Sequence, residues 1–251
     1  MKYLFWTLPL AACLIAPGLA AQSKPAQTPG SQGITREQAD EILKELRAIR
    51  QLLEKQAGRP QAAAQAGDTV SVRIDGGQWL GNPNAPLTMV EYTDYQCPFC
   101  RAFYASTFPE IRKKYIDTGI VRFVSRDLPL DFHPNAMSAA EAADCAADQG
   151  KFWEMRDLLA ADPRKLAEED LLGYAAKLQL KMADFKSCLA SGKHREEIQR
   201  DMAEAASLHI DGTPSFVIGR TTPQGVDGEV VVGAQPFAAF EAKFQQLRPA
   251  K

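Results

Sequence analysis

The stretch that decides the fold runs from residue 91 to residue 100, with the sequence Glu-Tyr-Thr-Asp-Tyr-Gln-Cys-Pro-Phe-Cys. Its first residues belong to an apolar run, Leu87 to Tyr92, that is typical of a buried strand. The residues after it predict a helix that extends to about Tyr115. The two cysteines, Cys97 and Cys100, are therefore expected where a strand passes into a helix.

The rest of the chain extends this pattern. A strand from Ile120 to Ser125 completes a strand, helix, strand unit, which favours a parallel pair with a right-handed crossover. From Pro134 to about Leu208 the sequence predicts helix, with breaks at 161–163 and 191–192. Further strands are predicted at 70–74, 215–218 and 229–232, and a last helix at about 236–247. The fold class is thus α/β, interrupted by an inserted helical bundle.

The spacing of the two cysteines points to redox chemistry. A sulfur at the start of a helix lies next to unpaired main-chain N–H groups, which favour the thiolate and lower the pKa of Cys97. Pro98 suits the first helical turn, where no main-chain donor is required. Cys100, one turn further along, can attack a mixed disulfide at Cys97. The alternative is half of a zinc site, but the sequence has no second CxxC and no His pair at finger spacing.

Composition excludes other classes of function. The chain has 251 residues and a formal net charge of -2, with 29 Lys+Arg against 31 Asp+Glu. No basic excess is present to neutralise phosphates, so no nucleic-acid partner is expected. A chain of this length buries a core that does not depend on disulfides. Its five cysteines therefore need a chemical or compartmental explanation.

The N-terminal segment resembles a secretory signal. Residues 1–20 combine Lys2 with an apolar stretch too short to span a membrane and with small residues before Ala20. An alternative is lipoprotein processing at Cys13, which follows Leu10-Ala11-Ala12. Cleavage after Ala20 leaves four cysteines, and an even number in an exported chain favours disulfides. The expected location is the periplasm.

A separate helix is predicted before the globular domain. Residues 21–34 form a flexible spacer, 35–57 a helix and 58–68 a linker, so that the domain occupies 69–251. Thr35 and Gln38 provide a capping box. The apolar positions follow the 3, 4 spacing of a coiled-coil seam: Ala39, Ile42, Leu46, Ile49 and Leu53. This stripe packs either on its own domain or on another copy of the chain, as a homodimer or homotrimer.

Three motifs together resemble a known family. Residues 81–86, with the sequence Gly-Asn-Pro-Asn-Ala-Pro, the stretch 91–100 and Gly212-Thr213-Pro214-Ser215-Phe216 are similar to the bacterial DsbA-like thiol-disulfide oxidoreductases of the thioredoxin fold. The resemblance implies that the helices at about 134–208 form a domain inserted into that fold. It also implies an oxidising, exported setting and an activity on disulfides of unfolded or misfolded exported proteins.

The resemblance also assigns roles to residues. Pro214 matches a cis-proline whose loop faces the active cysteine, and Pro98, Phe99, Thr213 and Pro214 are expected to contact substrate. Glu91 matches an acid beneath the active site that takes protons from the resolving cysteine. The alternative for Glu91 is an ordinary acid at the edge of the sheet.

Two further cysteines lie in the predicted helical insert. With Cys97 and Cys100 assigned to the active site, Cys145 and Cys188 are left to form a structural disulfide, which would stabilise the fold by about 4 kcal/mol through loop closure. The alternative is a pair of buried free thiols. The histidines, His133, His194 and His209, are expected to be caps or surface residues. No metal or cofactor is expected.

One departure from the strongly oxidising relatives bears on the direction of electron flow. Where those relatives carry a histidine between the cysteines, this chain has Phe99, which supplies no charge and predicts a less oxidising disulfide. The resemblance adds that Thr213 is the residue type of isomerase-like and reductase-like relatives, whereas the strong oxidases tend to carry Val there. Together with the coiled-coil-like N-terminal helix, these features favour an oligomeric enzyme that reshuffles as well as introduces disulfides. The alternatives are an isomerase or reductase kept reduced by a membrane partner, a non-enzymatic chaperone or copper-handling protein, and a scaffold whose N-terminal helix binds a partner.

Overall fold

The computed structural model describes residues 35–57, 69–74 and 76–248. The chain divides into two units, Met1–Arg59 and Pro60–Lys251. The predicted signal, spacer and linker lie outside the described residues. Among the described residues, no helix combines the length and the apolar character that crossing a membrane requires.

The described part of the first unit is one helix, α1, Arg36–Ala57. It begins where the sequence predicts, because Thr35 N donates to Gln38 Oε1 at 3.0 Å and Gln38 N donates to Thr35 Oγ1 at 3.2 Å. These two bonds are the reciprocal pair of a capping box. On this helix Ile42 and Leu46 are exposed, at 48% and 56%. Self-association through this stripe stays a prediction.

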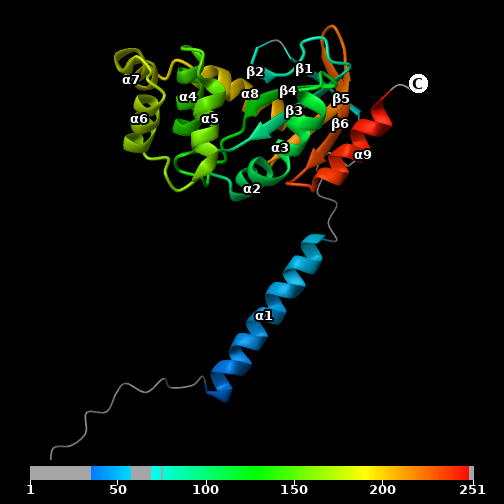
Figure 1. The fold of residues 1–251 in the computed structure, drawn as a ribbon. Coiled ribbons are helices and arrows are strands. Elements are labelled where there is room, and N and C mark those ends of the chain that lie inside the picture. Colours follow the sequence, from blue (N-terminus) through cyan, green and yellow to red (C-terminus); the bar gives the residue numbers. More distant parts are fainter. Residues whose placement is uncertain (1–34, 58–68, 75, 249–251) are drawn as a thin grey trace, which may run out of the picture. The chain divides into compact units, whose positions relative to one another are not determined.

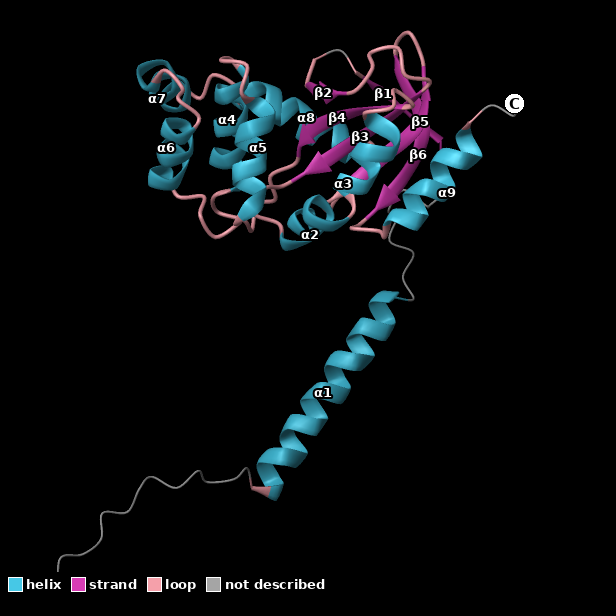
Figure 2. Ribbon diagram, in the orientation of Figure 1, coloured by secondary structure: helices cyan, strands magenta, loops and turns pink. Residues whose placement is uncertain are grey.

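The second unit is built on a mixed six-stranded sheet (Figure 2). Its strands are β1 Thr69–Arg73, β2 Gln78–Leu80, β3 Leu87–Thr93, β4 Val121–Asp127, β5 Ser215–Thr221 and β6 Gly225–Val232, in the order β1-β6-β5-β3-β4-β2. The predicted parallel pairing of β3 with β4 is confirmed, and the other pairs are antiparallel. Strand β2 was not predicted from its three residues. The α/β fold class is confirmed.

Side-chain alternation along β3 separates two cores. Leu87 and Met89 pack against the helices α2, Pro98–Ser106, and α9, Phe237–Leu247. Val90 and Tyr92 join the cluster on the opposite face, which helix α8, Arg195–Ser207, helps to cover. Because side chains on a strand alternate between faces, Glu91 shares the face of Met89, toward α2.

The helix predicted to continue to Tyr115 is broken. Helix α2 ends at Ser106, α3 spans Phe108–Ile111, and a π-helical turn, η1, spans Arg112–Ile116. Pro109 accounts for the break, because it lacks a main-chain N–H and its ring clashes with the preceding turn. The prediction of a single helix was therefore wrong.

Along the chain, the predicted insert follows β4 and precedes β5, and Figure 1 shows its helices α4 to α7 beside the sheet. It comprises α4 Ala136–Ala147, α5 Phe152–Ala161, α6 Glu168–Lys177, α7 Met182–Ser191 and α8. Two of its four breaks were predicted, and the breaks at 148–151 and 178–181 were missed. At these two breaks Gly150 and Gln179 adopt positive φ angles of 70° and 58°, which end a right-handed helix.

Candidate active site

Cys97 lies at the N-cap of α2, and Pro98 occupies the first helical turn. The turn that leads there from β3 is closed by Asp94, whose main-chain O accepts a hydrogen bond from Cys97 N at 3.1 Å. The carboxylate of the same residue accepts one from Gln96 N at 2.7 Å. This Asx-type turn aims the sulfur of Cys97 at the main-chain N–H groups that open the helix.

The environment separates the acidities of the two thiols. The pKa of Cys97 is lowered to about 5, because the Cys100 thiol donates a hydrogen bond to its sulfur and the main-chain N–H groups of Phe99 and Cys100 add to this effect against the cost of burial. The pKa of Cys100 is raised well above its ordinary value by burial, by its bond to Cys97 and by the charge of Glu91. One cysteine is thus suited to be the nucleophile and leaving group, the other to keep its proton.

The loop before β5 faces this pair. The peptide bond between Thr213 and Pro214 is cis. In its thiol form Cys97 donates a hydrogen bond to the main-chain O of Thr213, 3.4 Å away. Phe99, two residues after Cys97, is 64% exposed, and Pro98 is exposed as well. Of the residues for which substrate contact was predicted, Thr213 contacts Cys97, and Pro98 and Phe99 are exposed next to it in the chain.

Glu91 lies in the interior of the protein. It is fully buried on β3, which has β4 on one side and β5 on the other. The alternative interpretation as an acid at the edge of the sheet is therefore wrong. Its carboxylate accepts a hydrogen bond from the guanidinium of Arg156, which also donates to Ser125 Oγ.

Arg156 is a residue of the site that sequence reasoning missed. It comes from α5 of the inserted bundle and is 2% exposed. Burial opposes its charge, but the neighbouring Glu91 carboxylate outweighs that cost and raises the pKa of Arg156. The one available signal was its position on the apolar stripe of Phe152, Met155 and Leu159, where a single cation is unusual.

The guanidinium of Arg156 lies among aromatic rings. Its carbon is 5.2 Å from the ring centroid of Tyr104, 5.5 Å from those of Phe123 and Trp153, and 5.9 Å from that of Phe108. Such faces attract a cation, and the attraction is larger where water is excluded. The rings and Glu91 together compensate the desolvation of this charge.

A second missed contact holds the loop between β4 and α4. Asp94 Oδ2 is 2.8 Å from His133 Nδ1 and accepts a hydrogen bond from Leu130 N at 2.9 Å. His133 is therefore tied to the turn that carries Cys97. The neighbouring Phe132 is 74% exposed. This loop presents an aromatic ring to solvent next to the turn of the active site.

Cys145 and Cys188 form a disulfide that joins α4 to α7. Cys97 and Cys100 are free thiols. The four cysteines of the described residues thus separate into a reactive pair at the sheet and a cross-link in the insert.

The comparisons with known proteins agree with this geometry. The family model described as thioredoxin matches residues 74–229. Among curated proteins, the Na(+)/H(+) antiporter NhaA 3 of Salinispora tropica is 39% identical over 170 residues, which are 67% of this chain and 25% of the antiporter. NhaA of Herminiimonas arsenicoxydans is 36% identical over 152 residues, which are 60% of this chain and 24% of that antiporter. The chain spans about a quarter of the length of these relatives.

Solved structures are similar over most of their length. Wolbachia pipientis alpha-DsbA1 superposes with a TM-score of 0.62 at 26% identity, covering 70% of this chain and 92% of its own. Bacillus subtilis BdbD superposes with a TM-score of 0.58 at 25% identity, covering 71% of this chain and 97% of BdbD. A thioredoxin-like oxidoreductase from Silicibacter pomeroyi DSS-3 superposes with a TM-score of 0.56 at 28% identity, covering 69% of this chain and 93% of its own. The chain therefore belongs to the thioredoxin family, as a protein with the DsbA-like form of the thioredoxin fold.

Proposed function

We propose that this protein is exported and forms or reshuffles disulfide bonds in secreted proteins through the cysteines of Cys97-Pro98-Phe99-Cys100. One observation carries the proposal. The sulfur at the N-cap of α2 has its pKa lowered to about 5, while the pKa of the sulfur three residues later is raised. That difference is what a thiol-disulfide exchange enzyme needs, since Cys97 leaves and attacks as a thiolate.

The exchange runs in two steps from the oxidised enzyme. A substrate thiolate attacks the sulfur of Cys97, the Cys97–Cys100 bond breaks, and Cys100 takes up a proton. A second substrate thiolate then attacks the substrate sulfur of the mixed disulfide and releases Cys97 as a thiolate. The substrate gains a disulfide and gives two electrons to the enzyme. In the reverse direction Cys100 must lose its proton, and Glu91, buried on the same face of β3, is proposed to accept it.

Substrate recognition is proposed to involve the surface around Cys97. Phe99 offers an exposed apolar ring, and the main chain at Thr213 and Pro214 faces the sulfur. Phe132, on the loop tied to Asp94, offers a second ring. Such a surface suits an extended, unfolded segment with apolar side chains, in which main-chain and apolar contacts are accessible.

The oxidising strength of the Cys97–Cys100 disulfide is proposed to be intermediate. A pKa of about 5 for Cys97 lies between about 7 for thioredoxin and about 3.5 for DsbA. A less acidic Cys97 stabilises the reduced form less, so the disulfide is less oxidising. We propose an enzyme that introduces and reshuffles disulfides. The second candidate is an isomerase or reductase kept reduced by a membrane redox partner.

The compartment and the assembly are also proposals. The sequence of residues 1–20 supports export to the periplasm. The exposed apolar side chains of α1 support self-association into a homodimer or homotrimer. Two copies of the active site would raise the effective concentration of a substrate through successive exchanges.

The decisive experiment is the equilibrium potential of the Cys97–Cys100 pair against glutathione, together with refolding of reduced and of scrambled ribonuclease. Cys97→Ala is expected to abolish both refolding activities. A chaperone would retain its effect in that variant, and so would a scaffold. If Cys97→Ala acts like the unchanged protein, the redox proposal is wrong.

A further inference from the structure

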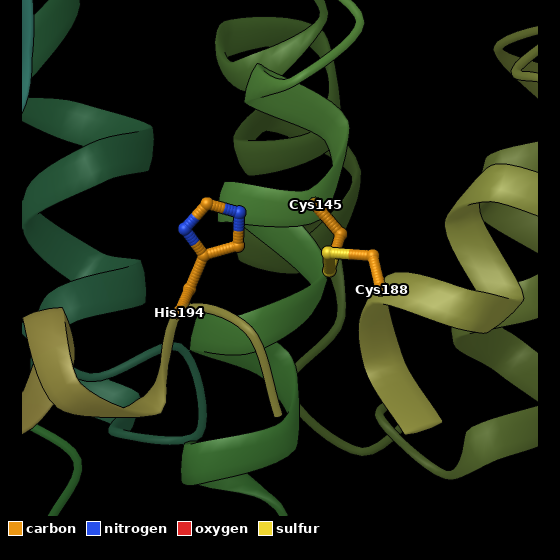
Figure 3. A group of neighbouring side chains, drawn as sticks. All are labelled: Cys145, Cys188 and His194. Atoms are coloured by element: carbon orange, nitrogen blue, oxygen red, sulfur yellow. A yellow bond between two sulfur atoms is a disulfide. The ribbon is translucent and has the colours of Figure 1, made fainter. Parts of the chain in front are cut away.

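A second group of sulfur and nitrogen ligands lies in the helical insert, away from the active-site cysteines. Cys145 on α4, Cys188 on α7 and His194 at the N-cap of α8 each place one ligand atom within 4.8 Å of the others. Figure 3 shows the imidazole of His194 beside the disulfide of the two cysteines. Among the described residues, this is the one group of three or more such side chains that converges closely enough to hold a metal ion.

A carboxylate lies next to two members of this group. Asp148 Oδ2 is 3.6 Å from Cys188 Sγ and 3.1 Å from His194 Nε2. Asp148 follows the last turn of α4, three residues after Cys145, and therefore lies on the same side of that helix. A left-handed turn at Gly192, with a φ angle of 61°, ends α7 and brings His194 back toward Cys188. Four donor groups thus meet from three helices.

Two thiolates, one imidazole and one carboxylate form a four-coordinate zinc set. Zinc prefers tetrahedral coordination by Cys, His and Asp side chains. With a neutral imidazole, the zinc ion, the two thiolates and the carboxylate carry a net charge of about -1. The ammonium of Lys193 lies 2.8 Å from Asp148 Oδ2 and compensates that charge. Such partners of a ligating carboxylate orient it toward the metal.

We infer that, in the thiol form of this pair, Cys145 and Cys188 bind one zinc ion together with His194 and Asp148. Cysteines are synthesised as thiols, so the newly made chain needs no reductant. Binding releases the two thiol protons to solvent. When a disulfide oxidant later accepts two electrons from the pair, the Cys145–Cys188 bond forms and the zinc ion leaves. The metal and the disulfide therefore exclude each other at one site.

The geometry is compatible with this exchange. Zinc–sulfur and zinc–nitrogen distances of about 2.3 and 2.0 Å place tetrahedral ligands roughly 3.3 to 3.8 Å apart. Because Cys145, Cys188 and His194 place their ligand atoms within 4.8 Å of one another, the imidazole needs to approach by about 1 Å at most. The two sulfurs, which are bonded to each other in the disulfide, must move apart, and side-chain rotation allows both movements. A depression of about 360 Å³ lined by Cys145, Cys188 and Asp148 gives an ion access from solvent.

The test uses the full chain with Cys13→Ser, Cys97→Ser and Cys100→Ser, so that the pair at 145 and 188 provides the only thiols. Zinc is titrated into the reduced and the disulfide forms against a chromogenic chelator, and cobalt is used as a spectroscopic substitute. The reduced form is expected to bind one zinc per chain, and its cobalt complex to show thiolate-to-metal absorption. The disulfide form is expected to bind none.

Matched variants assign the ligands. In the same background, His194→Ala and Asp148→Asn are expected to weaken zinc binding at least about tenfold, whereas His209→Asn, at a histidine outside the group, leaves it unchanged. Far-ultraviolet circular dichroism follows folding, and if the reduced chain unfolds, zinc must restore its helices. Absence of zinc binding by the reduced form, or unchanged binding in Cys145→Ser with Cys188→Ser or in His194→Ala, overturns the inference.

Discussion

Arg156 of the inserted bundle binds Glu91 of the central strand in a buried ion pair, with both side chains at most 2% exposed. The negative charge of Glu91 in turn helps raise the pKa of Cys100. The insert therefore does more than cover the sheet, because it supplies the cation that compensates the acid whose charge raises the pKa of Cys100. The ion pair therefore bears both on the stability of the fold and on the pKa of Cys100.

Removing one partner of the Arg156–Glu91 pair should lower the free energy of unfolding. Arg156→Met leaves Glu91 buried without its cation, and we expect the free energy of unfolding in urea to fall by about 3–5 kcal/mol. Arg156→Met combined with Glu91→Gln removes both charges, and we expect this double variant to be much closer to the unchanged protein. If the single and double variants unfold at the same urea concentration, the unpaired charge of Glu91 is not the cause of the lost stability.

The acidity of Cys97 predicts a characteristic pH dependence. With a pKa lowered to about 5, the thiolate forms at low pH, so its alkylation by iodoacetamide should rise through about pH 5 and change little from pH 6 to 8. Cys100→Ala removes the hydrogen bond that is the largest cause of the shift and should move the midpoint upward. A midpoint near 8.5, as in an ordinary thiol, would contradict the assignment.

The same shift links stability to pH. The pKa of Cys97 is lower in the folded than in the unfolded protein, so the reduced form gains stability above the unfolded pKa of about 8.5 and loses it as the pH falls toward about 5. The oxidised form has no such thiolate. The difference in melting temperature between reduced and oxidised protein should therefore move in favour of the oxidised form as the pH falls, which calorimetry at several pH values can measure.

Local patterns allowed much of the fold and the reactive pair to be predicted. The apolar run of β3 and the cysteines after it indicated a strand, helix, strand unit, and β4 pairs with β3 as expected. The contacts that were missed join distant residues: Arg156 and Glu91 are 65 positions apart. Gln179 was missed for another reason, because its left-handed conformation follows from packing and not from residue type.

The assembly of the chain through α1 can be tested on its apolar stripe. Ile42 and Leu46 are exposed on this helix, and a coiled-coil seam would bury them. Leu46→Glu places a charge in that seam and should reduce the mass measured by light scattering to that of a monomer. Lys44→Glu is the control, since it introduces the same side chain on the opposite face and should leave the mass unchanged. An unchanged mass for Leu46→Glu would exclude assembly through this stripe.

Phe132 should affect large substrates and spare small ones. Its ring is 74% exposed on the loop that Asp94 holds beside the turn of Cys97, so it can lie against an apolar segment of an unfolded chain. Loss of about 1 kcal/mol of apolar contact in Phe132→Ala should lower kcat/KM for reduced ribonuclease roughly fivefold. The rate with dithiothreitol, which is too small to reach the ring, should stay the same. Equal losses with both substrates would instead place the effect of Phe132 on the cysteines themselves.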